Sequence, residues 1–143
     1  MTLSDRTTAS VLMIIGIILG GLSVFALFVQ ITLWFGNVQS VKVIEWKKKQ
    51  VDEFVVFSYL NEDGHTYQIE KEIPSRYKDE LKQKPFLTIK YSRIYPGKTE
   101  VTGVPTFDYI YYILGIVLMS VLVLRSVRAL RGRITMKDFA GLR

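Results

Sequence analysis

The chain has 143 residues, of which 49% are hydrophobic, and it carries a formal net charge of +6 with one histidine and no cysteine. This length allows one domain at most. Two long stretches contain no formal charge, one between Arg6 and Lys42 and one between Asp108 and Arg125. They leave about 70 residues between them for a folded unit, which is too little for a soluble enzyme with a deep, well-buried active site.

The first uncharged stretch predicts a transmembrane helix over residues 10–35. Its 26 residues include only four polar side chains, those of Ser10, Ser23, Gln30 and Thr32. At ~1.5 Å per residue, a helix of this length crosses the ~30 Å hydrocarbon layer of a bilayer. A cleaved signal peptide is the alternative, but the run far exceeds the ~7–15 apolar residues of a signal and no small-residue cleavage site follows it. We therefore expect an uncleaved anchor.

Residues 107–127 predict a second, shorter transmembrane helix. Tyr109–Leu124 provides 16 uncharged residues, below the usual ~20. The aromatic residues at its start are typical of the belt that lies at a membrane interface. At its far end, the long side chains of Arg125 and Arg128 can extend toward lipid headgroups.

Basic residues determine the predicted orientation in the membrane. Residues 125–143 carry six basic groups against one acidic residue, which places the C-terminal tail (128–143) in the cytoplasm by the positive-inside rule. Two spans then return residues 1–9 to the cytoplasm and place the domain formed by residues 36–106 outside. Six basic residues near the outer span ends oppose this assignment. However, ten acidic residues dilute them in a loop longer than the ~60 residues over which the rule is strong.

Four segments between the spans have the alternating or continuous apolar pattern of β-strands. They are residues 38–46, 54–60, 65–73 and 86–92. The sequence Asn-Glu-Asp-Gly at residues 61–64 fits a short hairpin turn closed by a glycine in the left-handed region. Between Pro74 and Pro85, a short helix can direct Tyr77 and Leu81 toward the sheet. The predicted fold class is membrane α+β, with two transmembrane helices flanking a small, mostly antiparallel β domain that contains a short helical insert.

The strands and turns of this domain follow a recognisable pattern. A strand ending in aromatic-Ser-Tyr is followed by an Asp-Gly turn, a strand restarting with x-Tyr, then Leu-x-Ile-x-Tyr and a proline turn, all between two spans. The residues that carry the pattern are Tyr59, Asp63, Gly64, Tyr67, Ile89, Tyr91 and Pro96. Residues 38–104 therefore resemble the bacterial membrane-protein family of the domain of unknown function numbered thirty-five ninety-two. The resemblance implies the fold, the topology and a location in the bacterial inner (plasma) membrane with both termini cytoplasmic; it implies no activity.

The sequence contains no recognisable catalytic or metal-binding set. His65 is the only histidine, and as a ligand or a general base it would need cysteine, a second histidine or converging carboxylates as partners. Glu70 and Glu72 share a strand face and Asp79 and Glu80 lie on the helix, all among lysines, which is typical of a solvated surface. No Ser-His-acid set, phosphate-binding loop or zinc spacing occurs. We therefore predict no catalytic residue, no metal and no cofactor.

The end of the β domain away from the membrane is predicted to be basic. A first strand of nine residues is ~30 Å long, so the three lysines after it lie at the distal tip, and alternating strands bring the helical insert to the same end. Seven basic side chains there meet four acidic ones, a net +3 that attracts an acidic protein partner; solubilising lysines on loop tips are the alternative. The seven are Lys47, Lys48, Lys49, Arg76, Lys78, Lys82 and Lys84.

Two further features concern the spans themselves. Gly16, Gly20 and Ser23 form a stripe of small residues that lets another helix approach closely, either the second span of this chain around Gly115 or a helix of another protein. The basic side chains that follow the second span predict contact with anionic lipids, with a plain topology signal as the alternative. They are Arg125, Arg128, Arg131 and Arg133. Nucleic-acid binding is not expected, because the membrane divides the positive charge and no exposed aromatic residues interleave with it.

These features support two functional hypotheses. The first is a non-catalytic double-pass membrane protein whose extracytoplasmic β domain binds another protein, as an accessory subunit or as an immunity-type factor that blocks a toxin. The second is a structural subunit of a membrane complex that acts through its transmembrane helices. An envelope hydrolase that depends on His65 is a remote third.

Overall fold

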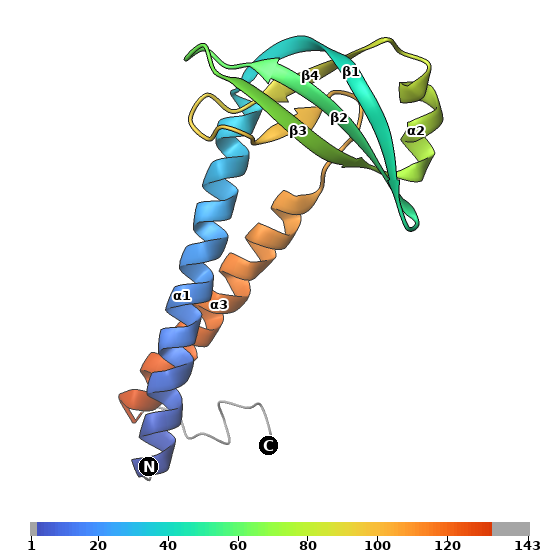
Figure 1. The fold of residues 1–143 in the computed structure, drawn as a ribbon. Helices are drawn as coiled ribbons and strands as arrows, with labels where there is room; N and C mark the ends of the chain where they lie inside the picture. Colours follow the sequence, from blue (N-terminus) through green and yellow to red (C-terminus); the bar gives the residue numbers. More distant parts are fainter. Residues whose placement is uncertain (1–2, 133–143) are drawn as a thin grey trace. The chain divides into compact units, whose positions relative to one another are not determined.

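The computed structural model describes residues 3–132 and contains three helices and five strands in this part of the chain (Figure 1). In order they are α1 (Leu3–Trp34), β1 (Asn37–Lys49), β2 (Asp52–Leu60), β3 (Thr66–Ile73), α2 (Ser75–Lys82), β4 (Phe86–Tyr91), β5 (Thr99–Val101) and α3 (Asp108–Leu130). The chain divides into two compact units. The β unit is Val29–Thr106, and the helical unit combines the described parts of Met1–Phe28 and Phe107–Arg143.

Both long helices have the length and composition needed to cross a membrane. The apolar span within α1 is Ser4–Trp34 and the one within α3 is Asp108–Leu130. α1 begins at Leu3, before the predicted residue 10, and Asp5 lies in its first turn, where a negative charge stabilises the N-terminal end of a helix. α3 ends at Leu130, and Gly132 adopts the positive φ of +70° that commonly follows a helix.

The five strands of the β unit form one antiparallel sheet in the order β3-β2-β1-β4-β5. The expected antiparallel β domain is confirmed, and β5 is a strand that the sequence pattern missed. β1 has 13 residues, where the sequence predicted nine, and it belongs to both halves of the sheet. Its first half pairs with β4, from Asn37↔Tyr91 to Lys42↔Phe86, and its second half pairs with β2. A bulge between Val43 and Glu45 separates the two halves. The strongly curved sheet is therefore a half-barrel (Figure 1).

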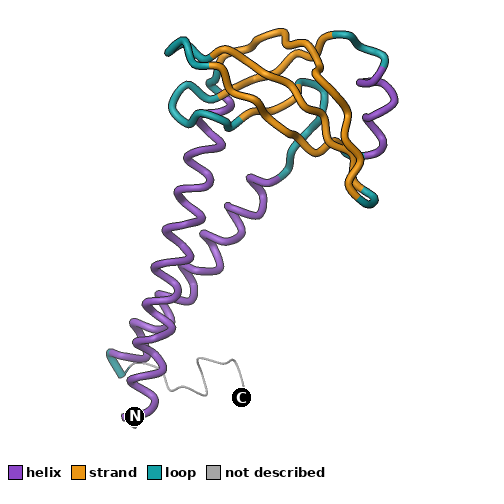
Figure 2. Tube along the Cα trace, viewed as in Figure 1, coloured by secondary structure: helices purple, strands orange, loops and turns teal. Residues whose placement is uncertain are grey.

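The inner face of the half-barrel holds the hydrophobic core. Tyr59 is 2% exposed, and its ring lies 5.6 Å from that of Tyr67 and 4.8 Å from that of Tyr91. The short helix α2 lies beside one end of the sheet (Figure 2). It contributes the buried Leu81 and the half-buried Tyr77 to the core, as predicted. The buried core residues are Val41, Val55, Phe57, Tyr59, Ile73, Leu81, Leu87, Ile89, Tyr91, Val101 and Val104.

The last turns of α1 belong to the β unit and are fastened to the end of β4. The hydroxyl of Thr32 lies 2.9 Å from that of Ser92, and the Lys90 ammonium donates a hydrogen bond to the carbonyl of Trp34 at 3.2 Å. Gly36 lies against the backbone of Tyr91 so closely that a Cβ at this position would clash with it. The helix thus enters the sheet through a tight junction.

Candidate binding groove

The side chains considered for catalysis lie on the surface of the β unit. Residues 3–132 contain no group of three or more His, Cys, Asp or Glu side chains able to hold a metal ion. His65 is exposed in the turn before β3. Glu70 pairs with two lysines and Glu80 with Lys84 at 2.8 Å. These carboxylates therefore lie in surface ion pairs.

The structure brings the predicted basic residues to the end of the unit that holds the β1–β2 hairpin, but it also brings acidic partners. Lys47 lies 3.1 Å from Glu45 and 3.6 Å from Glu70, and Lys49 also pairs with Glu70. These two glutamates were not among the four acidic residues expected there. Each of these two glutamates adds one negative charge to this end of the β unit, so its net charge is +1 instead of the predicted +3. The surface is thus close to neutral as a whole.

The helical insert makes the most enclosed of these ion pairs. The Glu53 carboxylate lies 2.7 Å from the Lys78 ammonium and 2.5 Å from that of Lys82, and only 12% of its side chain is exposed. The hydrogen bonds from Lys78 and then Lys82 lower the pKa of Glu53 to about 2. Lys82 also lies over the Trp46 ring at 5.3 Å, and Arg76 over the Tyr77 ring at 4.6 Å. These contacts attach α2 to the sheet rather than present free charge.

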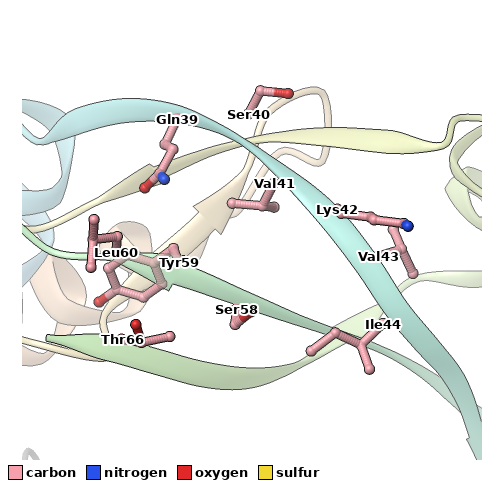
Figure 3. Close-up of a pocket in the computed structure, with 10 residues that line it drawn as sticks. All are labelled: Gln39, Ser40, Val41, Lys42, Val43, Ile44, Ser58, Tyr59, Leu60 and Thr66. Carbon is pink, nitrogen blue, oxygen red and sulfur yellow. The ribbon is translucent and has the colours of Figure 1, made fainter.

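A groove opens where β1 and β2 separate (Figure 3). The pairing of β2 with β1 ends at Phe57↔Val43, but β2 continues to Leu60 and is paired there only with β3. On the other side, residues 37–42 of β1 pair only with β4. Among residues 3–132, two strand edges therefore face each other across the opening without pairing. The space between them is about 610 Å³, and its lining residues are Gln39, Ser40, Val41, Lys42, Val43, Ile44, Ser58, Tyr59, Leu60 and Thr66.

The groove combines a buried floor with an unsatisfied polar group. Val41 and Tyr59 belong to the core, and the Tyr59 hydroxyl accepts a hydrogen bond from the backbone N–H of Gly97 at 3.0 Å. Burial raises the pKa of this phenol above its ordinary value. The Oε1 atom of Gln39 is buried and accepts no hydrogen bond from any described residue. Figure 3 shows the Gln39 side chain extending from β1 into the opening.

The rim of the groove is apolar at two points and positively charged at one. Ile44 and Leu60 are each 53% exposed, which is high for large aliphatic side chains. Lys42 is exposed and forms no hydrogen bond or ion pair within residues 3–132. Such a mixture of open backbone, apolar side chains and one charge is suited to recognising a polypeptide.

Sequence reasoning missed this groove, although one signal pointed to it. The residues of β1 that face the core follow the two-residue period of a strand up to Val43, but the next one is Trp46, three residues later. A step of three indicates one extra residue, which is a β-bulge. Bulges redirect a strand, and this one carries β1 from one half of the sheet to the other.

The small residues of the spans lie between α1 and α3 of the same chain. A Cβ at Gly16 would lie 2.8 Å from Val123, one at Gly20 3.3 Å from Met119, and one at Gly115 2.6 Å from the Ser23 hydroxyl. Close approach at these positions thus serves packing within the chain.

Among the basic residues considered for lipid binding, Arg125 and Arg128 lie on the last turns of α3 and Arg131 follows it. Arg133 and the rest of the tail lie outside the described residues.

Comparison with models of protein families, with curated proteins and with solved structures finds no match. The resemblance to a family of membrane proteins stays a prediction, and the function has to be argued from the groove.

Proposed function

We propose that this chain is a non-catalytic double-pass membrane protein that presents its β unit outside the cytoplasm to bind another protein. The observation that carries the proposal is the groove between β1 and β2, where two unpaired strand edges surround the unsatisfied Gln39 oxygen. Its lining of backbone, amide, hydroxyl and aliphatic groups suits recognition of a polypeptide. An accessory subunit of a larger complex and an immunity-type factor that blocks a toxin both fit this arrangement.

The membrane location is part of the same proposal. Two helices that are long and apolar enough to span a bilayer support it, and the basic C-terminal tail supports cytoplasmic termini in a bacterial inner membrane, with anionic lipid at its side chains. Alkaline phosphatase fused after Glu62 should be active, because the enzyme folds only outside the cytoplasm. The same enzyme fused after Arg131 should be inactive. The reverse pattern would overturn the orientation.

Photo-crosslinking in living cells tests whether the β unit binds a protein. A photoreactive amino acid replaces Thr66 at the groove, Lys48 on the basic surface, or Leu118 on an exposed face of α3. We expect adducts with another protein from Thr66 and none from Leu118. Adducts from Lys48 alone would move the binding surface to the basic end of the β unit, and adducts from Leu118 alone would refute the proposal.

The alternative function, a structural subunit acting through its helices, has less support from the contacts. Gly16 and Gly20 pack against α3 of the same chain, so replacing both with leucine would first disturb the chain's own helix pair. If the groove is the binding surface, the double leucine variant should keep its Thr66 adducts whenever it folds, while charge reversal of Lys42 should weaken them. The opposite pattern would favour the alternative.

A further inference from the structure

One edge of β1 has no paired strand between residues 38 and 42 among the described residues, although β1 lies in the middle of the sheet. Resting on the proposed function, we infer that the groove binds an extended segment of the partner protein, which pairs with residues 38–42 of β1 as an added β-strand. The inference specifies the kind of ligand, a polypeptide backbone in the β conformation, and the edge that receives it.

The pairing pattern supports an added strand. In an antiparallel sheet, alternate residues of a strand direct their N–H and C=O groups to one side and the intervening residues direct theirs to the other. In the part of the chain that the structure describes, β1 is paired between Asn37 and Lys42 with β4 on one side only. The groups on its other side face the groove. An unpaired row of this kind is a ready template for another strand.

The dimensions agree with this ligand. Residues 39–44 line one wall of the groove, and six extended residues span ~20 Å at ~3.3 Å each, an ordinary strand length. The volume of about 610 Å³ lies within the ~300–1,000 Å³ of pockets that hold ligands. The register Val43↔Phe57 closes the narrow end, so an added strand enters from the wide end, near Gln39.

Four side chains define what the added strand carries. The buried Oε1 of Gln39 lacks a donor, which a backbone N–H or a side-chain amide of the ligand supplies. Lys42 has no ion-pair partner among the described residues, so a carboxylate of the ligand fits opposite it. The exposed Ile44 and Leu60 favour apolar side chains on the ligand face that covers them. The expected ligand is therefore a strand of alternating apolar residues with one acidic residue.

The experiment uses the full chain in lipid nanodiscs and a phage library of random nine-residue peptides. The best binder is then synthesised with one backbone N-methyl group at each position in turn, which removes one hydrogen-bond donor at a time. An added strand predicts a loss of about tenfold in affinity at alternate positions and little change at the intervening ones. The amides of residues 38–42 should also exchange hydrogen more slowly with the peptide bound.

Charge variants identify the edge. Lys42→Glu should lower the affinity for the peptide by about tenfold. Lys48→Glu, the matched change on the same strand outside the groove, should leave this affinity unchanged. Equal tolerance of N-methylation at all positions, equal loss in both variants, or no selected peptide at all would overturn the inference. If Thr66 still crosslinks to a protein in cells after such a result, the proposed function survives and only strand addition fails. If both experiments fail, the proposed function fails as well.

Discussion

Replacing Gly36 with alanine should damage the junction between α1 and the sheet. A Cβ at this position would lie 2.8 Å from the carbonyl carbon of Tyr91 and 2.9 Å from the carbonyl oxygen of Leu33, with the Tyr91 oxygen closer still. Ordinary contact begins at 3.4 Å, so the backbone of β4 must retreat by at least 0.6 Å, since 3.4 minus 2.8 is 0.6. Backbone atoms on both sides leave no flexible side chain to move instead.

The loss of stability caused by Gly36→Ala follows from the hydrogen bonds that the displacement of β4 weakens. The first pair of the β1–β4 ladder, Asn37↔Tyr91, and the hydroxyl contact between Thr32 and Ser92 both lie at the point of the clash. Overpacking against rigid neighbours costs about 3 kcal/mol. The lower entropy of alanine in the unfolded chain offsets this by about 0.5–1 kcal/mol. We expect a net loss of about 2 kcal/mol.

Denaturant unfolding in detergent micelles, followed through the fluorescence of Trp46 beside the core, measures this loss. Gly21→Ala is the matched control, because a Cβ at Gly21 meets nothing within 4 Å. The control should be as stable as the unmodified chain or slightly more so. A Gly36→Ala variant within about 0.5 kcal/mol of the unmodified chain would refute the idea that the junction is tight.

Three further predictions concern the two units separately. Glu53→Gln should make the free energy of unfolding depend less on pH in acid. In the unmodified chain the pKa of Glu53 is lowered from the ordinary 4.5 to about 2 by folding, so the unfolded chain binds more protons between these values and stability is lost as the pH falls. Glutamine does not titrate, so the variant lacks this loss. Tyr59→Phe should cost about 1 kcal/mol in urea unfolding, because the part-buried hydrogen bond from the Gly97 N–H to the Tyr59 hydroxyl is lost. The double variant Gly20→Cys with Met119→Cys should form a disulfide within one molecule on mild oxidation. A Cβ at Gly20 lies 3.3 Å from that of Met119, near the ~3.8 Å typical of disulfides. The unmodified chain has no cysteine, so these two thiols can pair only with each other or with a second molecule.

Each of these predictions has a control in the chain. Glu80→Gln removes an exposed ion pair and should change the acid side less than Glu53→Gln does. Tyr67→Phe alters the same aromatic stack, but its hydroxyl has no hydrogen-bond partner among residues 3–132, so its stability should hardly change. Gly21→Cys should not crosslink to Met119→Cys. Dimers rather than internal bonds from the Gly20 pair would contradict packing within the chain.

The regular elements could be predicted because their signals are local. The apolar runs that gave both long helices, and the alternation that gave β3 and β4, depend on neighbouring residues only. The turn at residues 61–64 was equally readable. Gly64 has the expected positive φ of +78°, and its N–H donates to the carbonyl of Asn61 at 3.0 Å. Such features need no knowledge of the rest of the fold.

The parts that could not be predicted depend on pairing between distant strands. β5 has three residues, too few for a period to be visible. One of the two glutamates missed at the basic end, Glu70, reaches Lys47 and Lys49 from β3 across β2. The other, Glu45, lies on β1 two residues before Lys47 and could have been counted from the sequence. The groove likewise depends on where the pairing of β1 with β2 stops, which is set by the register and the bulge.

The tight junction at Gly36 also ties the end of α1 to the wall of the groove. The groove begins at Gln39, only five residues beyond the last residue of α1, and this short segment lies within the compact unit Val29–Thr106. The hydrogen bonds of Thr32 with Ser92 and of Lys90 with Trp34 hold the last turn of α1 against the end of β4. A change that loosens this turn should therefore also displace the edge of β1, which makes the end of the helix part of the architecture of the groove.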